Sequence, residues 1–74
     1  MIDELDTVVL TIDLPDAGLK EGDVGAVVLV HDGGAGYEVE FVTFAGETVG
    51  VFSLTPEQVR SMGHRELPHA RAIA

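Results

Sequence analysis

Two segments in the middle of the chain alternate hydrophobic and polar residues with a period of two, which is typical of β-strands buried on one face. They span residues 37–44 and 47–54, and the Ala45-Gly46 pair between them predicts a tight hairpin turn. Pairing around this turn places Tyr37 opposite Leu54, Val39 opposite Phe52, and Phe41 opposite Gly50. We expect these side chains to share one face and to form the core.

Three further segments complete an all-β prediction. Residues 7–12 are rich in β-branched residues, which favour strands, and we also expect strands over residues 24–31 and 59–62. The middle of segment 24–31 is apolar on both faces, which indicates a strand covered on both sides. Residues 13–18 contain Pro and Gly at positions typical of turns, and we expect Leu19 to return from this loop into the core.

The opposite face of the predicted hairpin combines acidic and apolar residues. The same register pairs Glu38 with Ser53, Glu40 with Val51, and Val42 with Val49. Valines on a solvated strand face favour association, and acids around them resemble the charged rim of an interface. We therefore predict that a partner binds Glu38, Glu40, Val42, Val49 and Val51. The alternative is that the N-terminal segment, the C-terminal tail or another strand covers the valines.

The region before the last strand carries a helix-start signal. Thr55 is a suitable N-cap, Pro56 suits the first helical position, and Gln58 can reach back to the cap. Residues 63–74 show no clear period. The predicted fold is a small five-stranded SH3-like barrel over residues 1–62, with a one-turn helix before the last strand and a loose C-terminal tail over residues 63–74.

The charge of the chain restricts its partners. The net charge is −9, from 13 acidic and 4 basic residues, so we expect no binding to nucleic acid, which requires clustered Lys and Arg. Basic protein surfaces should attract such a chain. At 74 residues there is room for one domain, and no cysteine can reinforce it. We expect no signal peptide, no membrane segment and a cytoplasmic location.

Several segments resemble known families. Five short strands with a long first loop resemble SH3-like barrels, and residues 22–28 are similar to the KOW motif of ribosome-associated proteins. More closely, the chain resembles a bacterial family known as domain of unknown function 4926, through residues 19–25, 37–41, 46–48 and 54–60. That resemblance implies a small companion of a larger neighbouring protein, in some cases a toxin. A weaker similarity, through residues 25–27 and 37–41, is to nitrile hydratase small subunits and their activators.

Candidate chemical sites have simpler interpretations. His64, Glu66 and His69 could ligate a metal, but no predicted helix or strand aligns them. The glycine-rich segment 33–36 precedes a strand, whereas a phosphate-binding loop opens a helix, so a hairpin loop is favoured. The acids of segment 13–23 lack the spacing of a calcium loop, and we interpret them as turn residues.

The sequence thus favours a non-enzymatic, acidic protein-binding module without a cofactor. An antitoxin-like or accessory role beside a larger, basic protein is the sharpest version, and a second copy of the chain is the other possible partner. The alternative function is a small ligand-binding or catalytic protein with its site in the Asp13–Asp23 loop. A KOW-type nucleic-acid module is the third hypothesis, and the net charge argues against it.

Overall fold

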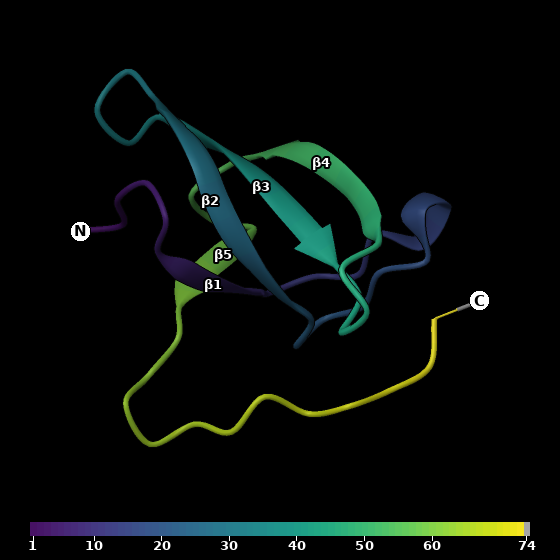
Figure 1. The fold of residues 1–74 in the computed structure, drawn as a ribbon. Helices are drawn as coiled ribbons and strands as arrows, with labels where there is room; N and C mark the ends of the chain where they lie inside the picture. The colour runs from purple at the N-terminus through teal and green to yellow at the C-terminus, as the bar shows by residue number, and fades with distance from the viewer. Residues whose placement is uncertain (74) are drawn as a thin grey trace.

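Five antiparallel strands form a single curved sheet in the computed structural model, which describes residues 1–73 (Figure 1). The strands are β1 (Thr7–Leu10), β2 (Val24–His31), β3 (Gly36–Val42), β4 (Thr48–Leu54) and β5 (Val59–Ser61). Their order in the sheet is β4-β3-β2-β1-β5, which is the order of an SH3-like fold. The all-β prediction is confirmed. Strands β4 and β5 are the two edges of the described sheet, so hydrogen bonds do not close it into a complete barrel.

The β3–β4 hairpin has a longer loop than the predicted two-residue turn. The register from Tyr37–Leu54 to Phe41–Gly50 is as predicted, but Val42 then pairs with Thr48. The amide of Thr43 donates to the Glu47 carbonyl at 2.8 Å, so residues 44–46 form the loop, with Gly46 at φ 90°. One extra residue, Val49, is accommodated as a bulge in β4.

The predicted one-turn helix before the last strand is wrong, although its hydrogen bonds are present. The Gln58 amide donates to the Thr55 carbonyl at 3.0 Å, and the Gln58 side chain accepts from the Thr55 amide at 2.8 Å. Strand β5 begins at Val59, so residues 56–58 form an isolated hydrogen-bonded turn that does not continue into a helix. The one helical element in residues 1–73 is the 3-10 turn η1 (Pro15–Ala17), in the first loop.

The core lies on the concave side of the sheet. Its buried members are Val8, Leu10, Leu19, Val27, Tyr37, Val39, Phe41, Leu54 and Val59. The predicted inward positions on β3 and β4 are correct, and Leu19 does return from the first loop. Val24 and Phe52 are half-buried rather than fully buried. The rings of Phe41 and Phe52 have centroids 6.1 Å apart, a common separation for a tilted aromatic pair.

Gly25 leaves space on β2 for side chains of β3. A Cβ at this position would lie 2.7 Å from Val39 Cγ1, 2.8 Å from Phe41 Cε2 and 2.9 Å from the Glu40 carbonyl. Gly50, which lies opposite Phe41, instead makes room for Phe52, whose Cζ would lie 2.7 Å from a Cβ. Two glycines therefore leave room for the Phe41 and Phe52 rings.

Replacing Phe41 with Ala should lower the free energy of unfolding by about 3–5 kcal/mol, because it leaves a cavity in the core. Phe44→Ala is the matched control, because the Phe44 side chain is fully exposed at the hairpin loop. It should change stability by no more than about 0.5 kcal/mol. Urea denaturation of the two variants measures the difference, and equal stabilities would contradict the core assignment.

Gly25→Ala should destabilise the protein by about 1–3 kcal/mol, because the added methyl overlaps two core side chains and a backbone carbonyl. Gly36→Ala is the control in the same sheet, since its nearest atom to an added Cβ is 3.5 Å away. Thermal unfolding should separate the two variants. A Gly25→Ala protein as stable as Gly36→Ala would show that the β2–β3 contact is not tight.

Candidate interaction surface

The outer face of β3 and β4 carries two acids held by their neighbours. Glu38 Oε2 accepts from Ser53 Oγ at 2.5 Å and contacts His31 Nε2 at 2.7 Å. Glu40 Oε2 accepts from Thr48 Oγ1 at 3.1 Å. The Ser53 hydrogen bond, followed by the His31 contact, lowers the pKa of Glu38. Glu38 therefore keeps its negative charge at mildly acidic pH.

Apolar side chains lie beside these acids on the same face. Val51 pairs with Glu40 and is 50% exposed, and Val42 at the end of β3 is 53% exposed. Leu29 of β2 pairs with Glu38 from the other side and is also exposed. Four of the predicted partner-binding residues, Glu38, Glu40, Val42 and Val51, thus share one face. Both valines stay about half exposed in the described part of the chain.

Val49 does not belong to this face, and its predicted position is wrong. It is half-buried and packs against the core cluster. The cause is the β4 bulge: the extra residue shifts the alternation, so that Thr48 rather than Val49 lies opposite Val42. The turn length, which the sequence pattern did not fix, decides which way this valine points.

Phe44 is the prominent surface residue that the sequence analysis missed. It lies in the hairpin loop after Val42 and is fully exposed. Alternation along β3 from Glu38 through Glu40 and Val42 reaches Phe44 next, and this signal could have pointed to it. Exposed aromatic side chains of this kind often anchor protein interfaces.

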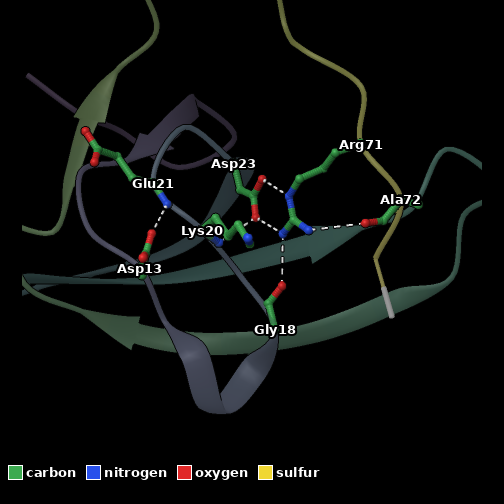
Figure 2. A network of polar contacts seen from close by, with 7 residues as sticks. All are labelled: Asp13, Gly18, Lys20, Glu21, Asp23, Arg71 and Ala72. Atoms are coloured by element: carbon green, nitrogen blue, oxygen red, sulfur yellow. Dashed lines mark hydrogen bonds and ion pairs between the residues drawn. The ribbon is translucent and has the colours of Figure 1, made fainter.

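The acids of the first loop serve the backbone of that loop (Figure 2). Asp13 Oδ1 accepts from the Glu21 amide at 2.8 Å, and Asp23 Oδ2 accepts from the Lys20 amide at 2.8 Å. These bonds satisfy amides in the turn that leads into β2, as expected for turn acids. The structure therefore gives both Asp13 and Asp23 hydrogen-bond partners in the backbone of this loop.

Arg71 of the C-terminal tail points into the same loop (Figure 2). Its Nε donates to Asp23 Oδ1 at 2.8 Å, its Nη2 donates to Asp23 Oδ2, and Nη2 also donates to the Gly18 carbonyl at 2.9 Å. The pairing with Arg71 is the main cause that lowers the pKa of Asp23. Two residues further on, Ile73 packs against the core cluster. Arg71 and Ile73 thus connect the C-terminal tail to the first loop and to the core.

The first part of the tail is also attached to the sheet. Arg60 donates to both carboxylate oxygens of Glu66 at 2.7 Å, and Glu66 also accepts from the Gly63 amide at 2.6 Å. Val9 points away from the core cluster yet is only 4% exposed, and it lines a shallow pocket together with Met62, Glu66 and Pro68. Residues 63–73 contain no helix or strand, as predicted, but they run across the sheet to the first loop (Figure 1).

Positive charge is scarce on the remaining surface. Of the four basic residues, Arg60 and Arg71 are paired with carboxylates of the same chain. Lys20 and Arg65 form no ion pair within residues 1–73. Residues 1–73 also contain no group of three His, Asp or Glu side chains placed to hold a metal ion, and His64, Glu66 and His69 form no such group.

Comparison with protein families shows which family the chain belongs to. Residues 4–61 match the family described as Domain of unknown function (DUF4926). The chain belongs to this family. The match covers the five strands of the DUF4926 fold and ends at Ser61, so the tail of this DUF4926 protein lies outside it. Searches among curated proteins and among solved structures find no match. Within residues 1–73, no helix is long and apolar enough to cross a membrane.

The Arg60–Glu66 pair predicts a specific pH dependence. Arg60, with help from the Gly63 amide, lowers the pKa of Glu66 to about 2 from its ordinary value of 4.5. A carboxylate with a lowered pKa stabilises the fold above the ordinary value, and this contribution is lost as the pH falls from 4.5 towards 2. NMR titration of the Glu66 carboxyl carbon should show the low midpoint.

Arg60→Gln is the control for this titration, because it removes the largest cause of the shift and leaves the Gly63 amide in place. The Glu66 midpoint should then rise towards 4.5. A midpoint that is ordinary in the parent, or unchanged in Arg60→Gln, would show that this part of the tail is not attached as described.

Proposed function

We propose that this DUF4926 protein is a non-enzymatic, acidic protein-binding module whose outer sheet face docks on a larger, basic protein. The observation that carries the proposal is the exposed apolar group of Val42, Phe44 and Val51 beside Glu38 and Glu40. An apolar centre with a polar rim is the usual organisation of a protein interface. We call these five residues the outer-face patch.

Each part of the patch has a distinct physical role in this proposal. Phe44 and the two valines supply apolar surface that is buried when the partner binds. Phe44 can enter a pocket on the partner because its ring is fully exposed. The glutamates attract a basic surface and fix its orientation, which raises the association rate at low salt. Ser53 and Thr48 hold the carboxylates over the sheet, so little side-chain freedom is lost when the partner binds.

The charge balance supports a basic protein as the partner. The net charge is −9, and two of the four basic side chains are already paired within the chain. Nucleic acid is therefore excluded from the proposal, because phosphate binding depends on available Lys and Arg. An antitoxin-like or accessory role is the narrower form of the proposal, and it is supported by the resemblance described above rather than by any contact in the fold.

The proposal predicts that Val51→Lys abolishes partner binding without unfolding the protein. The new side chain removes apolar area and repels a basic partner, and position 51 faces outward and is half exposed. Val51→Thr is the matched control, because it keeps the shape and adds no charge. Affinity purification with the parent and both variants, followed by mass spectrometry, identifies proteins retained by the parent and by Val51→Thr.

The expected result is a basic protein that Val51→Lys loses by at least about tenfold and that binds less tightly as salt increases. Circular dichroism of the variant should match the parent. A partner retained equally by Val51→Lys would contradict the proposal. Parent chains that self-associate, and that separate on Val51→Lys, would show that the patch binds a second copy instead.

A further inference from the structure

An open groove lies between the C-terminal tail and the β3–β4 hairpin. It has a volume of about 260 Å³, and its apolar wall is formed by Val24, Phe41, Val42, Phe44 and Val49. Asp23 and Arg71 also line it. Val42 and Phe44 belong to both the groove and the outer-face patch, so the two surfaces are continuous.

The tail shows what kind of segment this region binds. Its backbone has no helix or strand in residues 67–73, and two side chains fix it: Arg71 on Asp23 and the Gly18 carbonyl, and Ile73 on the core. A guanidinium that bonds both oxygens of one carboxylate is a specific form of recognition, because its planar donors match the acceptor geometry. Arginine followed two residues later by an aliphatic side chain is thus the pattern that fits.

The tail fits only part of the site. The groove remains open beside Val42, Val49 and the exposed ring of Phe44, so a larger side chain could bury apolar surface that the tail leaves exposed. The tail is also held at a partly exposed ion pair, with 31% of the Arg71 side chain and 17% of the Asp23 side chain accessible. Water therefore reaches the pair, and a competing segment that buries more apolar surface could displace the tail.

We propose that the groove is a binding site for an extended, basic segment of the partner protein. In this segment an arginine pairs with Asp23, and an aliphatic or aromatic side chain packs against the apolar wall. The chain's own tail occupies part of this site until the partner displaces it. This inference rests on the proposed function and adds the chemistry of the partner segment. The net charge of −9 favours a basic segment, and the continuity with the outer-face patch lets one partner cover both.

The tail competes because it is tethered. A segment joined to its site by a short connection acts at an effective concentration on the order of millimolar, so a free peptide of the same sequence binds the parent only weakly. Weakening the tethered tail should therefore raise the affinity for the free peptide. That relation shows whether the site accepts a segment other than the covalently attached tail.

The test uses the full chain and a fluorescent peptide with the sequence of residues 67–73. Arg71→Gln weakens the protein's own tail, and the peptide should bind this variant at least about tenfold more tightly than it binds the parent. A control peptide with glutamine in place of its arginine should bind Arg71→Gln no more tightly than it binds the parent. In the double variant Asp23→Asn/Arg71→Gln, the arginine peptide should lose its tighter binding, since the carboxylate is gone.

Backbone NMR locates the binding and confirms that each variant is folded. The peptide should shift the amides of Gly18, Lys20 and Asp23 in Arg71→Gln. No shift at a peptide concentration on the order of millimolar would overturn the proposal, as would equal binding of the two peptides. Parent dimers that exchange tails, and that Arg71→Gln dissociates, would overturn it in favour of a second copy.

Failure here is distinguishable from failure of the proposed function. Val51 does not line the groove, so Val51→Lys should leave peptide binding to Arg71→Gln chains unchanged. A partner lost on Val51→Lys while the peptide fails to bind would leave the outer-face patch supported and the groove rejected. The opposite pair of results would support the groove and reject the patch.

Discussion

The close contact between the Phe41 ring and the backbone of β2 at Gly25 is the constraint on which the rest of the structure depends. A domain of 74 residues without cysteine depends strongly on its core, and the Phe41 ring fits into that core because residue 25 has no Cβ. Once Phe41 points inward, alternation sends Glu40 and Val42 outward on the same strand. The outer-face patch is therefore a direct consequence of how the core is filled.

Two of the four basic side chains of this acidic chain hold the C-terminal tail in place. Arg60 and Arg71 attach the tail at its two ends, one to Glu66 within the tail and one to Asp23 across the fold. The Arg60–Glu66 pair is solvent-exposed and contributes little to stability by itself, whereas the Arg71–Asp23 pair is only partly exposed. Together with Ile73, which packs against the core cluster, they hold residues without regular structure against the folded domain. The remaining surface is left strongly negative, which suits a basic partner.

The tail changes the meaning of the acidic first loop. From residue types alone, Asp13 and Asp23 could have been members of a ligand site or ordinary turn acids. The contacts show Asp13 holding one turn amide and Asp23 holding another, while Asp23 also accepts an arginine from a distant part of the chain. Asp23 is thus both a structural residue of the loop and the recognition element of the proposed groove.

The sequence by itself determined the all-β class, the order of elements and the inward positions of β3 and β4. These follow from period-two patterning and turn residues, which are local properties of the chain. Membership of the DUF4926 family was likewise visible in short local motifs.

Only the tertiary structure decided the hairpin loop, the orientation of Val49 and the position of the tail. The alternating pattern fits a two-residue or a three-residue loop equally well, and the bulge that absorbs the difference turns Val49 inward. The early start of β5 likewise prevented the predicted helix, because pairing with β1 takes up Val59. The Arg71–Asp23 pair joins residues 48 positions apart, and no local pattern encodes a contact that forms only after the sheet has folded.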